Sequence, residues 1–328
     1  MTNALTATNQ NANQTAGPLA IRSEAARKYA RASKSDRTLT LYAAAWREFE
    51  SFAADHAETP LPASPALVID YLVALAEAGA TVSTIDLKRA AIVHVHDAHN
   101  LPDPTGYAEV KAVMSGIRRE VGSAPVQKEA LTLADLRTLI NALPADLAGK
   151  RDRALLLVGF AGAFRRSELA ALNVADVHIN GALRVTIRKS KTDQEARGLV
   201  KVIPAIADQT LDPMNALREY LDAADIQSGP IFRRFNSYGV TKARLTPQSV
   251  ALIVKRAAQR AGIDARLLSG HSLRAGFITA AYNAGARDND IMELTGHKSR
   301  RTLDKYIRNA GKGAQAAVKA AFGQSNGA

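Results

Sequence analysis

Two arginines, two histidines and a tyrosine occur in an order that suits attack on a phosphodiester. The guanidinium groups of Arg165 and Arg274 can bind phosphate oxygens bidentately, which a lysine ammonium cannot do, and together they can hold both non-bridging oxygens. The Tyr306 phenol is a nucleophile, and its attack on phosphorus would store the bond energy in a phosphotyrosine that a 5′-hydroxyl can reverse without ATP. His271 is a candidate to accept or position the phenol proton, and His297 to donate a hydrogen bond to a non-bridging oxygen.

Motifs for other ways of breaking a phosphodiester are missing from the sequence. There is no G-x-x-x-x-G-K-[ST] or G-x-G-x-x-G motif for a nucleotide, no H-E-x-x-H, and no tight Asp/Glu cluster for a pair of metal ions. The chain has no cysteine, which removes disulfides, thiolate metal sites and a cysteine nucleophile. His94, His96 and His99 would be spread around a helix, so we interpret them as core or solvated residues. We therefore expect a reaction without metal or cofactor, carried out by side chains alone.

The charge of the chain points to a polyanionic partner. Its 328 residues include 43 Lys and Arg against 31 Asp and Glu, a net charge of +12, and nucleic acid is the commonest partner of such a surface. Residues 1–126 hold 12 basic against 13 acidic side chains, whereas residues 127–328 hold 31 against 18. This shift and the segment Val-Gly-Ser-Ala-Pro at 121–125 predict a linker over 122–128 between a first domain over 22–121 and a catalytic domain over 129–328. Residues 1–20 contain no Lys or Arg and are rich in Asn, Gln, Thr and Ala, which predicts a flexible tail over 1–21. No stretch reads as membrane-spanning or as a secretory signal, which favours a cytoplasmic location.

Hydrophobic spacing predicts a mainly α fold with one small antiparallel sheet. A helical bundle is expected from helices that begin after Ser35 and after Ser64 and from helical patterns over about 82–98 and 105–120. We interpret the aromatic residues of the first helix as core rather than as a platform for base stacking. In the second part, strands over 183–187 and 199–203 form a hairpin with a charged tip at 189–198. The helices expected there cover 132–140, 151–162, 209–224, 246–261, 272–284, 288–295 and 299–309.

Four segments of the chain carry a family signature. They read Ala-Phe-Arg-Arg-Ser-Glu-Leu at 163–169, Lys-Ser-Lys-Thr-Asp at 189–193, His-Ser-Leu-Arg at 271–274, and Thr-Gly-His at 295–297 with Tyr306 downstream. In this order they resemble the tyrosine recombinases, the phage integrase family, and especially its Cre-like and chromosome-dimer-resolving members. These segments hold five motifs: the Arg before Glu-Leu, the Lys, His-x-x-Arg, Gly-His and the Tyr. Each motif alone is weak evidence for a family, but all five in this order on a basic, cysteine-free chain are strong evidence. The resemblance covers about residues 22–310.

The resemblance implies roles that the residues alone do not assign. It makes Lys191, on the hairpin tip, the general acid that protonates the leaving 5′-oxygen, with Lys189 as the alternative. It makes Glu168 a residue that supports the site, and it favours Arg165 over Arg166 as the clamp because the family's Arg stands three residues before this Glu. The family usually has Thr-Gly-Leu-Arg where this chain has Gly-Ala-Phe-Arg, a difference that concerns packing rather than chemistry.

By the same resemblance, the two domains would close on duplex DNA as a C-shaped clamp, with the first as a helical core-DNA-binding domain. The implied function is site-specific recombination, in which a nucleoid-associated tetramer cleaves inverted-repeat sites through a 3′-phosphotyrosine and exchanges strands through a Holliday junction. A C-terminal helix over 314–322 would dock on a neighbouring protomer or simply fray. Two alternatives stay open: a type IB topoisomerase-like nicking-closing enzyme, and a non-catalytic DNA-binding regulator with the same fold.

Basic residues outside the signature are candidates for DNA contacts, with solvated surface residues as the alternative at each position. The helix over 246–261 is the candidate for reading the major groove, and that over 82–99 for contacts in the first domain. The candidate DNA-binding residues are Lys88, Arg89, Arg233, Arg234, Lys242, Arg244, Gln248, Lys255, Arg256 and Arg260.

Overall fold

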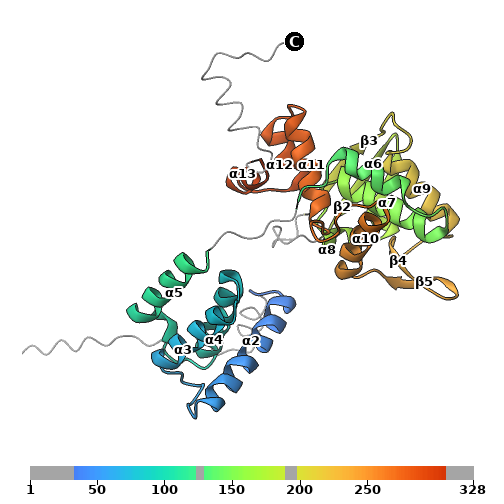
Figure 1. Ribbon diagram of the computed structural model, residues 1–328. Coiled ribbons are helices and arrows are strands. Elements are labelled where there is room, and N and C mark those ends of the chain that lie inside the picture. Colours follow the sequence, from blue (N-terminus) through green and yellow to red (C-terminus); the bar gives the residue numbers. More distant parts are fainter. Residues whose placement is uncertain (1–32, 123–128, 189–197, 308–328) are drawn as a thin grey trace, which may run out of the picture. The chain divides into compact units, whose positions relative to one another are not determined.

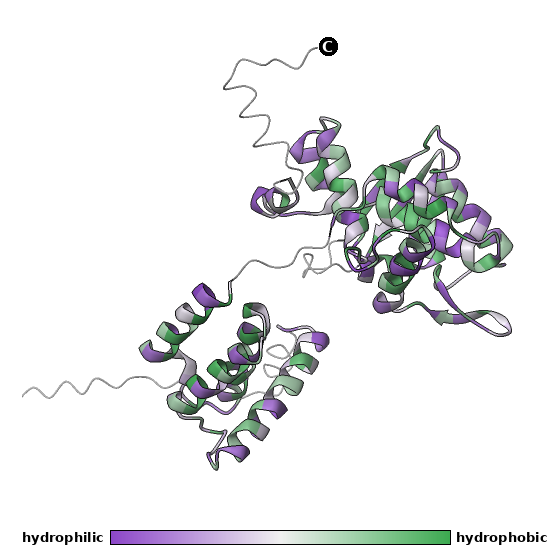
Figure 2. Ribbon diagram, viewed as in Figure 1, coloured by the Kyte–Doolittle hydropathy of each residue, from purple (hydrophilic) through white to green (hydrophobic). Residues whose placement is uncertain are grey.

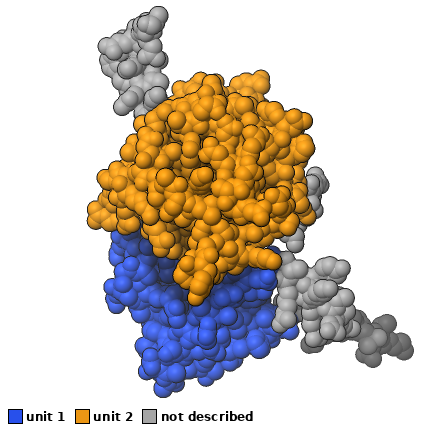
Figure 3. All heavy atoms as spheres, turned by 90° about the vertical axis from the view of Figure 1, so that its right-hand side faces the viewer, with its two compact units in different colours: residues 1–126 blue, residues 127–328 orange. Residues whose placement is uncertain are grey.

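The chain divides into two compact units, residues 1–126 and 127–328 (Figure 3). The computed structural model describes residues 33–122, 129–188 and 198–307. The expected N-terminal tail, nearly all of the expected linker, the hairpin tip with Lys189 and Lys191, and the C-terminal helix expected over 314–322 lie outside these residues. Among the described helices, none combines the length and the apolar character that a membrane crossing requires.

The described part of the first unit is helical, as the sequence predicts (Figure 1). The side-chain oxygens of Ser35, Ser64 and Thr81 accept hydrogen bonds from the backbone three residues ahead and so begin the first three helices. Phe49 is fully buried and Tyr71 is 3% exposed, which confirms that the aromatic residues form the core. The elements are α2 (Asp36–Asp55), α3 (Pro65–Glu77), α4 (Val82–Ala98), the 3₁₀ turn η1 (Pro104–Gly106) and α5 (Ala108–Glu120).

The histidines of α4 are structural, as the sequence analysis interpreted them. His96 is fully buried, and its Nε2 accepts a hydrogen bond of 3.0 Å from the backbone N–H of Ala63. Its Nδ1 lies 2.9 Å from the carbonyl oxygen of Ile92, so this nitrogen carries the proton and donates. His94 packs against the ring of Tyr42 with 5.3 Å between ring centroids. Both nitrogens of His96 are therefore used to join α4 to the segment before α3.

The second unit combines helices with a three-stranded sheet that has one exposed face, and adds a separate hairpin (Figure 1). Its strands are β1 (Val177–Asn180), β2 (Ala182–Ile187) and β3 (Leu199–Pro204), antiparallel in the order β1-β2-β3, and the pair β4 (Arg233–Asn236) and β5 (Gly239–Arg244). Its helical elements are α6 (Leu133–Asn141), α7 (Leu147–Ala161), α8 (Arg166–Ala171), η2 (Val174–Asp176), α9 (Pro213–Ala223), α10 (Pro247–Arg260), α11 (Ser272–Asn283), α12 (Asp288–Thr295) and α13 (Arg300–Ile307). The mainly α fold with a small antiparallel sheet is confirmed.

Helix α7 lies at the centre of this unit. Each residue from Ala154 to Phe160 is buried, and hydrophobic residues gather around this helix (Figure 2). Because its interior is apolar on all sides, α7 has to be enclosed by other elements. It begins four residues earlier than the sequence predicts, since Asp146 caps it by accepting a hydrogen bond of 2.7 Å from the backbone of Gly149. Its C-terminal end at Ala161 leads directly into the segment that carries Arg165.

Several short elements were not predicted from the sequence. These are β1, α8 and the hairpin of β4 and β5, whose elements have only four to six residues each and are too short for hydrophobic spacing to identify them. Helix α9 begins at Pro213 rather than at 209, because Asp212 caps it and proline occupies its first turn. The remaining helices of this unit and the strands β2 and β3 agree with the predicted ranges to within a few residues.

A small satellite core holds helix α13. Leu303 is fully buried against Ile278 of α11 and Ile291 of α12, while the rest of this short helix is largely hydrophilic (Figure 2). Arg300 adds an ion pair of 2.8 Å to Asp288 at the start of α12. Helix α13, with Tyr306, is therefore attached to the same chain's α11 and α12.

Gly276 gives a direct test of how closely α11 packs. A Cβ atom added here would lie 2.0 Å from the carbonyl oxygen of Leu131 and 2.9 Å from the ring of Phe160. We expect Gly276→Ala to lower the free energy of unfolding by about 1–3 kcal/mol, measured by urea unfolding followed by circular dichroism. The matched control is Gly116→Ala in α5, where nothing lies within 4 Å, and a helical alanine should stabilise by about 0.5–1 kcal/mol. Equal effects of the two variants would contradict this packing.

Candidate active site

A tight turn after α7 presents Arg165. Ala163 has a positive φ of 46°, the left-handed conformation in which glycine is favoured, and it stands at the position of the glycine in the family's usual Thr-Gly-Leu-Arg. The side chain of Phe164 is 1% exposed and packs into the main hydrophobic core of the second unit. A Cβ atom at Gly162 would lie 2.1 Å from its ring, so this ring is what requires the glycine one residue earlier. In the Gly-Ala-Phe-Arg segment, Gly162 and the ring of Phe164 therefore pack against each other directly before Arg165.

Glu168 fixes Arg165 at the start of α8. One carboxylate oxygen accepts a hydrogen bond of 3.0 Å from the backbone N–H of Arg165, and the other accepts one of 2.7 Å from its Nη1. The Glu168 side chain is only 3% exposed, so its charge is balanced within the protein by this guanidinium. Arg166 is exposed at the same turn. The structure thus brings Arg165, and not Arg166, into contact with the supporting carboxylate.

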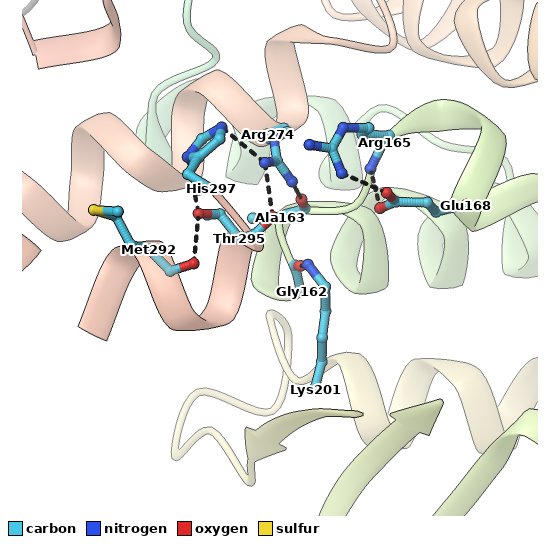
Figure 4. Close-up of polar contacts among 9 residues, drawn as sticks. All are labelled: Gly162, Ala163, Arg165, Glu168, Lys201, Arg274, Met292, Thr295 and His297. Carbon is cyan, nitrogen blue, oxygen red and sulfur yellow. Dashed lines mark hydrogen bonds and ion pairs between the residues drawn. The ribbon is translucent and has the colours of Figure 1, made fainter. Parts of the chain in front are cut away.

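Arg274 lies at the centre of the site and is fully buried. Its Nη1 donates to the carbonyl oxygen of Ala163 at 2.7 Å, and its Nη2 donates to the carbonyl oxygen of Thr295 at 2.8 Å and to Nε2 of His297 at 2.9 Å (Figure 4). Its Nε has no hydrogen-bond partner within the described part of the chain. Burial and the neighbouring charge of Arg165 both lower its pKa. Two guanidinium groups this close repel each other, and an anion between them would remove that cost.

His297 is positioned by the end of α12. Gly296 takes a left-handed conformation with φ of 69°, and the chain turns there. Nδ1 of His297 lies 3.0 Å from Oγ1 of Thr295, whose hydroxyl donates to the carbonyl oxygen of Ile291, so Nδ1 carries the proton. Burial and then Arg274 lower the pKa of His297 to about 4. Nε2 accepts from Arg274, and the hydrogen bond from His297 to a phosphate oxygen stays a prediction.

Tyr306 and His271 meet in the same site. The Tyr306 hydroxyl lies 2.9 Å from Nε2 of His271, and its ring is 5.6 Å from the His297 ring between centroids. His271 immediately precedes α11, so this helix positions both His271 and Arg274. Burial, followed by the charges of Arg274 and Arg165, lowers the pKa of His271. A neutral imidazole at neutral pH can accept a proton from a phenol.

Lys201 is a residue of the site that the sequence analysis did not identify. It lies on β3, is 1% exposed, and its Nζ donates a hydrogen bond to the carbonyl oxygen of Gly162 (Figure 4). Burial lowers its pKa to about 7, an effect that Arg274 and Arg165 reinforce and Glu168 opposes. Its position two residues before the buried Ile203 on a strand was the available signal, because side chains alternate between the faces. The predicted acids Lys189 and Lys191 lie outside the described residues.

The predicted DNA-binding residues fall into two groups. Arg244 donates to the carbonyl oxygens of Ala170 and Leu172, and Arg233 to those of Pro230 and Ser228, so both guanidinium groups hold the protein together. In the first unit, the Lys88 ammonium forms an ion pair with Glu48, and Arg89 lies 3.7 Å from Asp86. The exposed candidates are Arg234, Lys242, Gln248, Arg256 and Arg260, and Lys255 is half-buried.

Comparison with known proteins decides the family. The model of the phage integrase family matches residues 129–312, more than half of the chain and including every described residue of the site. The chain belongs to the phage integrase family. It is therefore a DNA recombinase of the tyrosine type.

Relatives along most of the chain support the same assignment. An integrase/recombinase XerD homologue of Selenomonas ruminantium is 37% identical over 281 residues, which cover 84% of this chain and 82% of that protein. The tyrosine recombinase XerD of Xanthomonas axonopodis pv. citri is 33% identical over 186 residues, 54% of this chain and 57% of that one. The chain is thus a Xer-type member, and site-specific DNA recombination is the activity of this type.

Solved structures show the same fold. XerH recombinase bound to a palindromic difH substrate, in a post-cleavage complex, matches with a TM-score of 0.67 at 18% identity, over 90% of this chain and 83% of that one. A lambda integrase (75–356) dimer bound to a COC′ core site matches with a TM-score of 0.61 at 16% identity, over 85% of this chain and 91% of that one. At these identities the likeness concerns the fold of the chain.

Because the pKa of His297 is lower in the folded protein than in the unfolded chain, the free energy of unfolding depends on pH. The unfolded histidine takes up a proton near pH 6.5 and the folded one only near pH 4, so the folded state loses stability as the pH falls between these values. We expect His297 to contribute a loss of up to about 3 kcal/mol over this range. His297→Gln removes the titrating group, so urea unfolding between pH 4 and 7.5 should show a shallower acid decline for the variant. If the free energy of unfolding fell equally with pH in the wild type and the variant, the lowered pKa of His297 would be contradicted.

Proposed function

We propose that this protein cleaves and rejoins duplex DNA at specific sites through a 3′-phosphotyrosine, with strand exchange through a Holliday junction. The observation that carries the proposal is the hydrogen bond of 2.9 Å between the Tyr306 hydroxyl and His271, beside the buried Arg274. A nucleophile, a neutral acceptor for its proton and a cationic phosphate site are thus within one chain. Tyr306 comes from α13 and His271 and Arg274 from the start of α11 of the same chain, so in this proposal each protomer supplies its own nucleophile.

The cleavage step follows from these positions. His271 accepts the proton of the Tyr306 phenol, and the phenol oxygen forms a bond to phosphorus as the bond to the 5′-oxygen breaks. Arg165 and Arg274 bind the non-bridging oxygens, where negative charge concentrates in the transition state. The leaving 5′-oxygen takes a proton from Lys191 on the hairpin tip, as the family resemblance implies. Rejoining reverses each step, with a 5′-hydroxyl as the attacking group, and no nucleotide or metal is required.

Exposed basic residues provide a surface for the duplex. Arg234 and Lys242 lie on the β4–β5 hairpin, and Gln248 and Arg256 lie on α10. Phosphate contacts from these cations would give affinity that falls with salt, while Gln248 can read a base edge. The substrate we propose is a pair of inverted half-sites, and the working assembly is a tetramer of this chain on two such sites. The solved XerH relative bound to palindromic difH has a substrate of this kind.

Two alternatives use the same fold. A type IB topoisomerase-like enzyme would form the same tyrosine adduct but would reseal the original strands. A non-catalytic regulator would bind DNA without any adduct, which the intact arrangement of Tyr306, His271 and Arg274 disfavours. A DNA substrate with two sites separates the first from a recombinase, because only a recombinase produces strands joined between the sites.

Tyr306→Phe tests the nucleophile. The substrates are nicked duplexes from a library with two randomised inverted half-sites, in which the short strand beyond the nick diffuses away so that a covalent complex accumulates. We expect the wild-type protein to retain DNA after denaturation and the variant to retain none, a loss of at least about 10³-fold, because the phenylalanine ring has no oxygen to attack phosphorus. Duplexes recovered with the wild-type protein define the selected site.

Tyr282→Phe, another tyrosine of the described residues, is the matched control and should retain DNA as the wild type does. Binding of the selected duplex by Tyr306→Phe, measured by fluorescence anisotropy, should stay within about threefold of wild type, since the hydroxyl is not a binding group for the duplex. Persistent trapping by Tyr306→Phe would show that the nucleophile is misassigned.

A further inference from the structure

Lys201 is buried where a lysine is unusual. It stands on β3 opposite Val185 of β2, between positions 199 and 203 that face the core, while Val200 and Val202 on either side are 57% and 42% exposed. Lysine is almost never fully buried unless it is paired. Here its ammonium reaches past the sheet to the turn after α7, as Figure 4 shows. A buried cation at this place requires a reason beyond filling space.

The contacts of Lys201 join the sheet to the turn that carries the arginine clamp. Its Nζ donates to the carbonyl oxygen of Gly162 and lies 4.8 Å from the centroid of the Phe164 ring. The next carbonyl oxygen, that of Ala163, accepts from Arg274. Two cations from different elements therefore hold two consecutive carbonyl groups of one turn. Lys201 therefore links β3 to the turn that leads to Arg165.

Within the described part of the chain, the charges around Lys201 are mostly positive. The charged groups that face it there are the carboxylate of Glu168 of α8 and the guanidinium groups of Arg165 and Arg274. Glu168 is already bound to Arg165 at 2.7 Å. The carbonyl group and the aromatic ring offset the burial of the ammonium only in part, since burial of an unpaired charge is costly. A bound phosphodiester would supply the missing negative charge to all three cations.

We propose that Lys201 is a positioning residue for DNA cleavage, which holds the Gly162–Arg165 turn against β3 so that Arg165 and Arg274 meet one phosphate. The inference rests on the proposed function, because it assigns Lys201 a role in that reaction. It also couples the β2–β3 hairpin, which leads to the segment with Lys191, to the arginine clamp. The position of the hairpin and that of the clamp are thereby set together.

The alternative is a lysine that only stabilises the fold, and pH separates the two. In the folded protein Lys201 loses its proton near pH 7, and in the unfolded chain near 10.5. Stability contributed by this residue therefore rises with pH between these values, because the unfolded state then binds more protons. Positioning by a charged ammonium has the opposite dependence, since the hydrogen bond to Gly162 weakens when the charge is lost above pH 7. Activity and stability should move in opposite directions.

The experiment compares the wild type with Lys201→Met, which keeps the length of the side chain and removes its charge. Single-turnover formation of the covalent complex on the selected nicked duplex is followed from pH 6 to 9, at DNA concentrations below saturation, so that the rate reports the free protein. We expect the variant to be slower by about 10-fold to 100-fold at pH 6, because a small misplacement of the clamp is enough for such a loss. The ratio of wild-type to variant rates should shrink towards pH 9.

Controls keep the result interpretable. Lys150→Met removes an exposed lysine of α7 and should react at the wild-type rate. Urea unfolding at each pH measures the stability difference, and if Lys201→Met does not fold, Lys201→Gln, which keeps an N–H donor without charge, replaces it. A variant that cleaves at the wild-type rate, or a rate ratio that is constant with pH, would overturn the proposal. A wild-type protein that traps no DNA would overturn the proposed function instead.

Discussion

The buried guanidinium of Arg274 is the interaction on which the site depends. It binds the carbonyl oxygen of Ala163, the carbonyl oxygen of Thr295 and the ring of His297, and so ties the turn after α7 and the end of α12 to α11. A charge buried this deeply is tolerated only with several hydrogen bonds around it. The same bonds fix the orientation of the guanidinium and therefore of Nε, which has no hydrogen-bond partner among the described residues. The contacts that join α11 to the turn after α7 and to the end of α12 therefore also position Arg274.

The cationic surroundings also determine the protonation of the two histidines. Burial and the nearby arginines lower the pKa of both His271 and His297, so that both rings are neutral at neutral pH. Neutral His271 can accept a proton from Tyr306, and neutral His297 can accept a hydrogen bond from Arg274. The two arginines that we propose as the phosphate site thus also keep His271 neutral, as its proposed role of base requires, while His297 accepts a hydrogen bond from Arg274. In the proposed reaction, the charges of Arg165 and Arg274 would therefore contribute both to phosphate binding and to proton transfer from Tyr306 to His271.

The sequence predicts some residues of this site and not others. The difference depends on whether a residue is placed by its neighbours in the sequence or by contacts with distant parts of the chain. Arg165, His271, Arg274 and Tyr306 stand in short motifs at the ends or starts of helices, so local spacing was enough to find them. Lys201 was missed because Val-Lys-Val reads as a strand with its valines inside, whereas pairing with β2 places Lys201 opposite the buried Val185. The bonds from Arg244 to Ala170 and from Arg274 to His297 join residues distant in the sequence, which spacing alone cannot show.

The central claim is that Tyr306 becomes joined to the 3′-phosphate of the cleaved strand, and mass spectrometry of the trapped wild-type complex tests it most directly. After digestion by a protease and a nuclease, the account predicts that the peptide containing Tyr306 carries the added mass of a nucleotide 3′-phosphate. It further predicts a free 5′-hydroxyl on the other side of the break. A nucleotide on a different residue, or an attachment through the 5′-phosphate, would contradict the account.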